Sequence, residues 1–133
     1  MIPTNLKYTS THEWARLEGN LVTVGITHFA AENLADLVYL ELPQVGAPVR
    51  QGATFGCLES VKAVSDLYAM TDGTVVEVHQ ELADQLDKIT ADPYGEGWMI
   101  RIRTECPEDL DRLMSADEYE RFLTEEAEGT SSE

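Results

Sequence analysis

The sequence predicts a mainly β domain, and three observations support this fold class. About eight short apolar or alternating runs are separated by turns rich in Gly, Pro, Asn and Asp. The clearest helical patterns come only near the C-terminus, after residue 106. The 133 residues suffice for one domain with a core that needs no disulfide or metal. We therefore expect residues 1–133 to form one domain with a core at about 6–125.

The expected strands are short and follow one another along most of the chain. Gly19 and Asn20 tolerate positive φ and predict a hairpin turn between the second and third runs. Pro43 ends the fourth run because proline cannot donate to a ladder. The runs are 6–8, 14–17, 21–26, 37–42, 55–58, 64–69, 74–78 and 99–103.

Helices are expected at four places. Thr27 caps a short helix at 29–34, and one or two helical turns follow at 82–89. Pro107 suits the first turn of a third helix. Ser115 and Glu118 form a capping box for a fourth, with Tyr119, Phe122 and Leu123 as its buried stripe. The last residues, 125–133, have too little apolar content to pack and are expected to be a flexible acidic tail.

Charge and apolar content exclude several classes of function. Twenty-five acidic residues against nine basic ones give a net charge of −16, which repels nucleic acids and anionic membrane surfaces. No run is long enough for a membrane span, and the N-terminus shows neither a signal peptide nor an Arg-rich leader. We expect a cytoplasmic protein, of bacterial type, with partners that present basic faces.

Cysteine and histidine spacing predicts neither a redox pair nor a metal site. Cys57 and Cys106 are far apart in sequence. We expect Cys57 to be a small buried side chain in a strand and Cys106 to be a thiol in a loop. The three histidines, His12, His28 and His79, follow no ligand pattern. Trp14 and Trp98 are expected to be core or cleft-wall residues.

One lysine stands at the centre of the most informative stretch. The apolar runs 55–58 and 64–69 flank a short link, 59–63, so they are expected to pair as a hairpin with Lys62 at its tip. Lys62 is one of only three lysines, and its neighbours Val61 and Ala63 are apolar or small. Considered physically, an exposed lysine in a turn is most often a solubilising group, so spacing alone does not assign it a function.

The residues around Lys62 resemble the lipoyl-attachment stretch of the glycine cleavage system H proteins. The similarity includes Glu-Ser-Val-Lys-Ala-Val-Ser-Asp-Leu-Tyr-Ala at 59–69 and extends over about 6–125. Further segments in that family's order are Tyr8, His12-Glu13-Trp14, Val24 to Thr27, Glu41-Leu42-Pro43 and Asp92 to Trp98. The resemblance implies a barrel-sandwich hybrid of the lipoyl-domain type, with two small, similar antiparallel sheets and terminal helices packed outside.

The resemblance also implies a carrier without catalytic residues of its own. Lipoate is expected on Lys62, with Glu59, Ser60, Val61 and Ala63 recognised by lipoyl-attaching enzymes. The arm is expected to take the aminomethyl group of glycine from a pyridoxal-phosphate-dependent glycine decarboxylase to a tetrahydrofolate-dependent aminomethyltransferase. A dihydrolipoyl dehydrogenase then reoxidises it.

The resemblance implies a role for two acids in holding the loaded arm. Glu13 and Asp66 are expected to attract the cationic amine, because shielding it from water prolongs its lifetime. The alternative is that both are solvated surface acids.

Four other functions are considered for Lys62. A biotin carrier has methionine on both sides of its lysine, where this chain has Val61 and Ala63. Lipoyl domains of 2-oxoacid dehydrogenases are shorter and lack the segments at 12–14 and 92–98. A Schiff-base enzyme requires a desolvated amine, whereas a hairpin tip keeps the amine wet. A role in relaying lipoyl groups to other carriers stays open.

Overall fold

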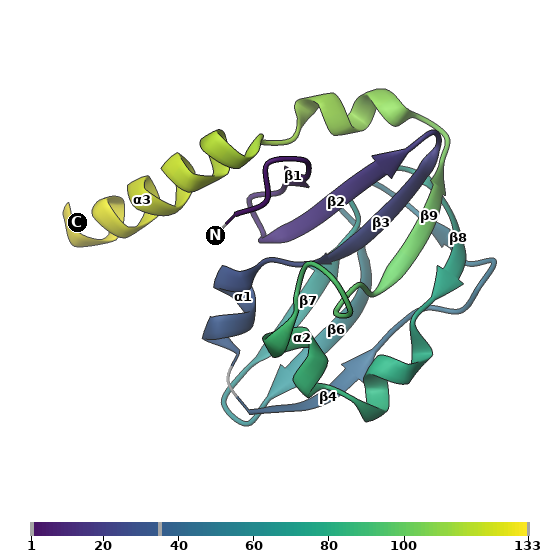
Figure 1. Ribbon diagram of the computed structural model, residues 1–133, viewed down its shortest axis with the longest axis horizontal. Helices are drawn as coiled ribbons and strands as arrows, with labels where there is room; N and C mark the ends of the chain where they lie inside the picture. The colour runs from purple at the N-terminus through teal and green to yellow at the C-terminus, as the bar shows by residue number, and fades with distance from the viewer. Residues whose placement is uncertain (1, 35, 133) are drawn as a thin grey trace.

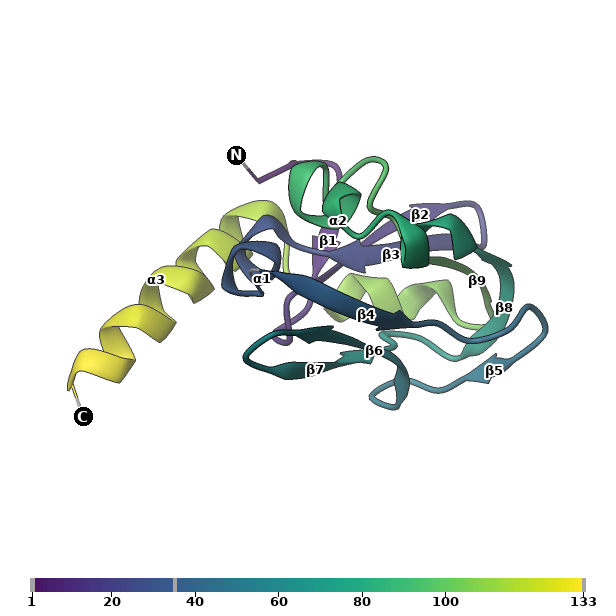
Figure 2. The same ribbon diagram turned by 90° about the horizontal axis from the view of Figure 1, so that it is seen from below.

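The computed structural model describes residues 2–34 and 36–132, with side chains described as far as Glu125. Two antiparallel sheets lie against each other, with short helical segments around them and a longer C-terminal helix that extends away (Figures 1 and 2). This confirms the expected mainly β fold of two sheets. The sheets are unequal, with six and three strands, so the similar halves implied by the resemblance differ in size.

The larger sheet joins segments from both ends of the described chain. Its central strand pair brings together two segments far apart in sequence, with Val22 opposite Ile102. The predicted hairpin at residues 18–21 is confirmed, and Gly19 adopts a φ of 67° in its turn. In spatial order the strands are β1 (Lys7–Tyr8), β2 (Glu13–Glu18), β3 (Leu21–Ile26), β9 (Ile100–Thr104), β8 (Gly73–Val78) and β5 (Pro48–Val49).

The smaller sheet carries the lysine hairpin. Its strands are β4 (Leu37–Glu41), β6 (Thr54–Ser60) and β7 (Val64–Tyr68), with β6 in the middle. Leu58 and Leu67 face the larger sheet and are almost completely buried. One continuous core joins them to the inward side chains Val22, Val24 and Ile102 of the larger sheet. Apolar contact between the two inner faces therefore holds the sheets together.

Helical segments cover the ends and edges of the sheets. They are α1 (His28–Asn33), η1 (Gln80–Asp84), α2 (Asp87–Ala91), η2 (Pro107–Arg112) and α3 (Ala116–Ser132), where η marks a 3-10 helix. The cap of α1 is confirmed, because the Thr27 hydroxyl accepts from the Ala30 N–H. The capping box is also confirmed, since Ser115 and Glu118 each accept a hydrogen bond from the other's backbone N–H.

An aromatic cluster attaches α3 to the larger sheet. The rings of Tyr8 and Tyr119 stack with centroids 4.8 Å apart, and both side chains are fully buried. Beyond this cluster α3 extends away from the sheets (Figure 1). The flexible acidic tail expected at 125–133 falls mostly on residues that lie outside the described side chains, and the backbone is helical through Ser132.

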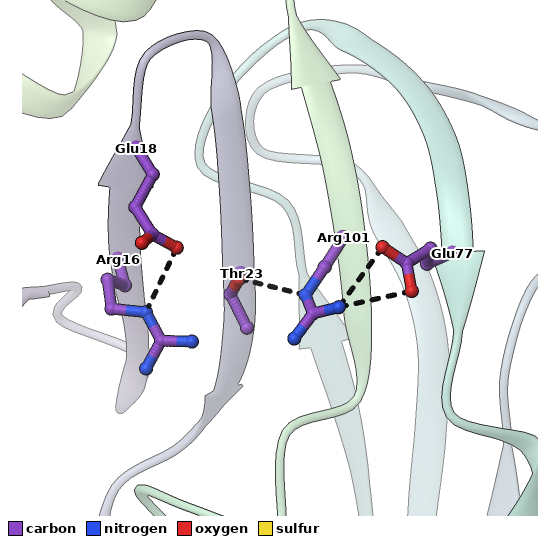
Figure 3. Close-up of polar contacts among 5 residues, drawn as sticks. All are labelled: Arg16, Glu18, Thr23, Glu77 and Arg101. Carbon is purple, nitrogen blue, oxygen red and sulfur yellow. Dashed lines mark hydrogen bonds and ion pairs between the residues drawn. The ribbon is translucent and has the colours of Figure 1, made fainter.

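Paired charges cross the outer face of the six-stranded sheet (Figure 3). Arg101 donates two hydrogen bonds to Glu77 at 3.0 and 3.1 Å and one to the Thr23 hydroxyl at 3.3 Å. Its guanidinium also lies 4.2 Å from the centroid of the Trp98 ring. On β2, Arg16 lies 3.5 Å from Glu18. Arg16 and Arg101 therefore each have a carboxylate partner within the same sheet.

Candidate functional site

The predicted lysine hairpin is present as β6 and β7. Glu59 lies opposite Val64, Cys57 opposite Asp66 and Gly56 opposite Leu67. Gly56 is required by the packing on the other side of β6, because a Cβ there would lie 2.2 Å from the Glu41 carbonyl oxygen of β4. The hairpin is therefore held on both sides of its first strand.

Ser60 shapes the turn that presents the lysine. Its backbone N–H donates to the Ala63 carbonyl at 2.8 Å, which closes the last pair of the ladder. Its side-chain oxygen accepts from the Ala63 N–H at 3.1 Å, in place of a backbone acceptor. The Val61 N–H donates to the Asp36 carbonyl at 3.1 Å, so the turn is also fixed to the segment before β4.

Lys62 is exposed on this fixed turn. Lys62 and Ala63 are exposed, and Val61 is 70% exposed. Among the residues whose side chains are described, none forms an ion pair with Lys62. An amine on a rigid, uncharged turn suits an enzyme that recognises a backbone shape and modifies one side chain.

A groove lies between the end of β7, the segment from Tyr8 to Glu13 and the start of α3. Its volume is about 640 Å³. Apolar side chains contribute much of its wall, and the charged lining residues are Glu13 and Arg112. The remaining lining includes Tyr8, Thr9, Ser10, Thr11, Gln51, Gly52, Tyr68, Ala69, Met70, Leu113, Met114 and Phe122.

Glu13 is a buried carboxylate in this groove rather than a solvated surface acid. Its side chain is 1% exposed. The Thr9 hydroxyl donates to Oε1 at 2.6 Å, and the Thr11 hydroxyl donates to the same oxygen. The Tyr68 N–H donates to Oε2 at 3.2 Å. Burial raises the pKa of Glu13, and these hydrogen bonds partly oppose the rise.

The burial of Glu13 agrees with the two-residue period of β2. Glu13 is in phase with Ala15, which lies opposite Val24 and packs in the core. Trp14, of the opposite phase, is fully buried as well, so alternation in the sequence does not by itself show that Glu13 faces inward. The clamp formed by Thr9 and Thr11 was not predicted, because it depends on how the segment before β2 folds against the Glu13 carboxylate.

Asp66 lies elsewhere, on the outer face of the three-stranded sheet. It is exposed and lines a second, smaller pocket together with Cys57, which lies opposite it on β6, and Glu41, which lies opposite Cys57 on β4. The structure therefore does not bring Asp66 and Glu13 into one cavity. Cys57, expected to be buried, is instead half-buried because it faces outward, and its thiol lies 3.5 Å from Glu41 Oε1.

Histidines and tryptophans have structural partners. His12 Nδ1 lies 2.7 Å from the Tyr119 hydroxyl, and His79 Nδ1 lies 2.7 Å from the Trp98 carbonyl. Trp14 is fully buried and donates to the Pro93 carbonyl at 2.8 Å. Within the described residues, no three His, Cys, Asp or Glu side chains gather as metal ligands.

A small two-sheet β domain that presents an exposed lysine on a hairpin tip is the architecture of carrier domains that bear a covalent group. The sequence profile described as Glycine cleavage H-protein matches residues 6–126. The chain belongs to this family.

Individual relatives agree with this assignment. The glycine cleavage system H protein of Anaeromyxobacter sp. (strain K) is 51% identical over 125 residues, covering 94% of this chain and 98% of the relative. That of Rubrobacter xylanophilus is 53% identical, covering 94% and 97%. A crystal structure of a glycine cleavage system H protein from Mycobacterium marinum superposes with a TM-score of 0.81 at 40% identity, covering 89% of this chain and 95% of that one. None of the described helices combines the length and apolar character needed to cross a bilayer.

Proposed function

We propose that this chain is the lipoyl carrier of a glycine cleavage system, with lipoate bound through an amide to Lys62. The exposed position of Lys62 on a turn held by Ser60 and Asp36 supports this most directly. The amide removes the lysine charge and lengthens the side chain. When bound, the group supplies a dithiolane that carries the aminomethyl unit between enzymes.

The residues next to Lys62 present the attachment point. Ser60 fixes the turn, and the two residues that flank Lys62, Val61 and Ala63, carry no charge. Glu59 is half-buried beside them on β6 and adds a negative charge that a basic attaching enzyme recognises. These four residues are the proposed recognition element for lipoyl attachment.

Glu13 is the proposed holder of the cationic amine of the loaded arm. It lies in the groove that the arm would occupy, and its carboxylate is oriented by Thr9, Thr11 and Tyr68. Both the cation and the carboxylate lose water when they are buried, and their mutual attraction compensates for this loss. Asp66 lies outside this groove. Its proposed role is therefore limited to attracting the cationic amine of the arm at the outer surface.

The proposed partners are the three enzymes of the glycine cleavage system that use the arm, in the bacterial cytoplasm. They are a pyridoxal-phosphate-dependent glycine decarboxylase, a tetrahydrofolate-dependent aminomethyltransferase and a dihydrolipoyl dehydrogenase. The net charge of −16 supports partners with basic docking faces. No catalytic residue is assigned to the carrier itself.

Intact mass of the protein purified from its host, followed by peptide mapping across residues 51–101, tests the central assignment. A lipoyl mass increment on Lys62 is the expected result. If Lys62 is unmodified in cells that make lipoate, the carrier function is wrong.

A further inference from the structure

Four strand edges bound the two sheets, and three of them are short or covered. β1 has two residues, and its Tyr8 is bridged to Met114. β5 also has two residues and begins with Pro48, which has no N–H to donate. η1 packs against β4. β7 is the fourth edge, and it is five residues long.

The backbone of β7 leaves hydrogen-bonding groups directed away from the sheet. Ser60 and Ala63 form a hydrogen-bonded pair. The alternation of an antiparallel ladder then directs the backbone N–H and C=O groups of Ser65 and Leu67 toward β6. The N–H and C=O groups of Val64 and Asp66 then point outward. Tyr68, next in this phase, supports the assignment, because its N–H leaves the sheet to donate to Glu13. Among the described residues, none is found bonding the outward groups of Val64 or Asp66.

Side chains beside this edge indicate which kind of strand it accepts. Val64 is 66% exposed, and Asp66 is exposed on the same face of β7. Glu59 and Glu41 lie on the same outer face of the neighbouring strands. An added strand with an apolar residue beside Val64 and a Lys or Arg beside Asp66 complements this face.

We propose that this edge, Val64 to Asp66, accepts an extended basic strand of the enzyme that attaches the lipoyl group to Lys62, which rests on the function proposed above. That enzyme must approach the hairpin closely, because the unmodified amine extends only a side chain's length from the turn. The edge begins at Val64, two residues after Lys62, which corresponds to about 7 Å along an extended chain. A strand paired with β7 brings its own domain next to the amine.

A second copy of this chain fits the edge poorly. Antiparallel pairing of two β7 strands places acidic Asp66 side chains near each other. Each copy also carries a net charge of −16. Like charge at the contact and over the whole chain therefore favours a partner of opposite sign.

Proline substitution tests the edge directly. Asp66→Pro removes an outward N–H while leaving the inner ladder bonds, and prolines are tolerated on edges in this orientation. Asp66→Asn removes only the charge. Val38→Pro is the matched control, because exposed Val38 lies at the irregular position of β4, on the opposite edge of the same sheet.

The measurement is kcat/KM for lipoylation of the unmodified chain by a bacterial lipoate–protein ligase with lipoate and MgATP, followed by intact mass. We expect a loss of about tenfold for Asp66→Pro and about threefold for Asp66→Asn, with Val38→Pro within about twofold of wild type. The unmodified chain has no arm, so these effects are independent of any arm docking by Asp66. Unchanged kcat/KM in a folded Asp66→Pro protein overturns the inference, whereas failure of wild type to be modified on Lys62 overturns the proposed function instead.

A second variant covers the case in which Asp66→Pro does not fold. Asp66→Lys keeps the N–H and reverses the charge, and about a tenfold loss is expected because a basic strand is repelled. An unchanged rate for Asp66→Lys overturns the basic partner. Sedimentation of wild type is expected to show no association through this edge, and a dimer abolished by Asp66→Lys would assign the edge to a second copy and overturn the inference.

Discussion

The two sheets of this domain differ in whether the polar groups on their edges and outer faces have partners within the sheet. The six-stranded sheet has two-residue edge strands, and on its outer face Arg101 and Glu77 pair with each other (Figure 3). The three-stranded sheet has an open edge, an acidic outer face and a lysine on its hairpin. The larger sheet thus satisfies its own polar groups, and the smaller one leaves them available to other molecules. Stability and interaction are therefore assigned to different sheets, which mutations can test.

The largest expected effect is at the tip of the smaller sheet. Lys62→Arg abolishes lipoylation, because the guanidinium cannot replace the amine, and it shifts Tm by less than about 2 °C because the side chain is exposed. Intact mass and thermal unfolding measure the two effects. Lys88→Arg is the control, since Lys88 lies on α2 and pairs with Glu96. A lipoyl increment that persists in Lys62→Arg contradicts the assignment.

The next effect concerns Glu13, which connects the two sheets. Glu13→Ala leaves two hydroxyls and the Tyr68 N–H without their acceptor, so the free energy of unfolding falls by about 2–3 kcal/mol. The lifetime of the aminomethyl-loaded form in buffer should also shorten. Urea denaturation and ammonia release measure these changes.

Glu13→Gln separates the two roles of this side chain. The amide keeps an acceptor for part of the clamp but carries no charge, so stability should lie between those of wild type and Glu13→Ala. The lifetime should still shorten, because the cationic amine loses its counter-charge. An unchanged lifetime in both variants excludes Glu13 as the holder of the arm.

A smaller effect is expected on the larger sheet. Arg101→Ala removes the pair with Glu77 and the contact with the Trp98 ring, and should lower the free energy of unfolding by about 1 kcal/mol. Lipoylation should not change. Arg103→Ala on the same strand is the exposed control, with an expected cost below about 0.5 kcal/mol. Slower lipoylation of Arg101→Ala would contradict the division between the sheets.

The smallest effect is a pH dependence that has opposite signs at two carboxyls. Burial raises the pKa of Glu13 in the folded state, so its contribution to stability is present at low pH and is lost as pH rises through the folded pKa. Hydrogen bonds from Ser115 lower the pKa of Glu118, whose contribution is lost as pH falls. As pH falls from about 7 to 4, wild type gains this contribution and Glu13→Gln does not. The variant should therefore become less stable relative to wild type as pH falls. Urea denaturation across this range checks the sign, and an opposite trend contradicts the burial of Glu13.

Relative to wild type, Glu118→Gln should show the reverse trend over the same range. The side chain of Glu118 is exposed and its cap is local, so the change is expected to be small. Parallel trends in the two variants would show that the pH dependence arises elsewhere in the chain.

Local chemistry determined much of this protein from the sequence alone. Alternation defined the strands, Gly19 and Asn20 the first hairpin turn, and Ser115 with Glu118 the start of α3, because each depends on residues close in sequence. The exposed hairpin around Lys62 was predicted on the same basis. Its chemical meaning came from family resemblance, because an exposed lysine in a turn has no unique physical role.

Only the tertiary structure decided which groups are buried and which edges stay open. Glu13 is buried because β2 faces the smaller sheet and meets Tyr68, 55 residues away. Asp66 is separated from it because the alternation of β7 turns Asp66 to the outer face. The open edge of β7 follows from which strands pair with which, and pairing between distant segments is determined by the shared core rather than by local propensity.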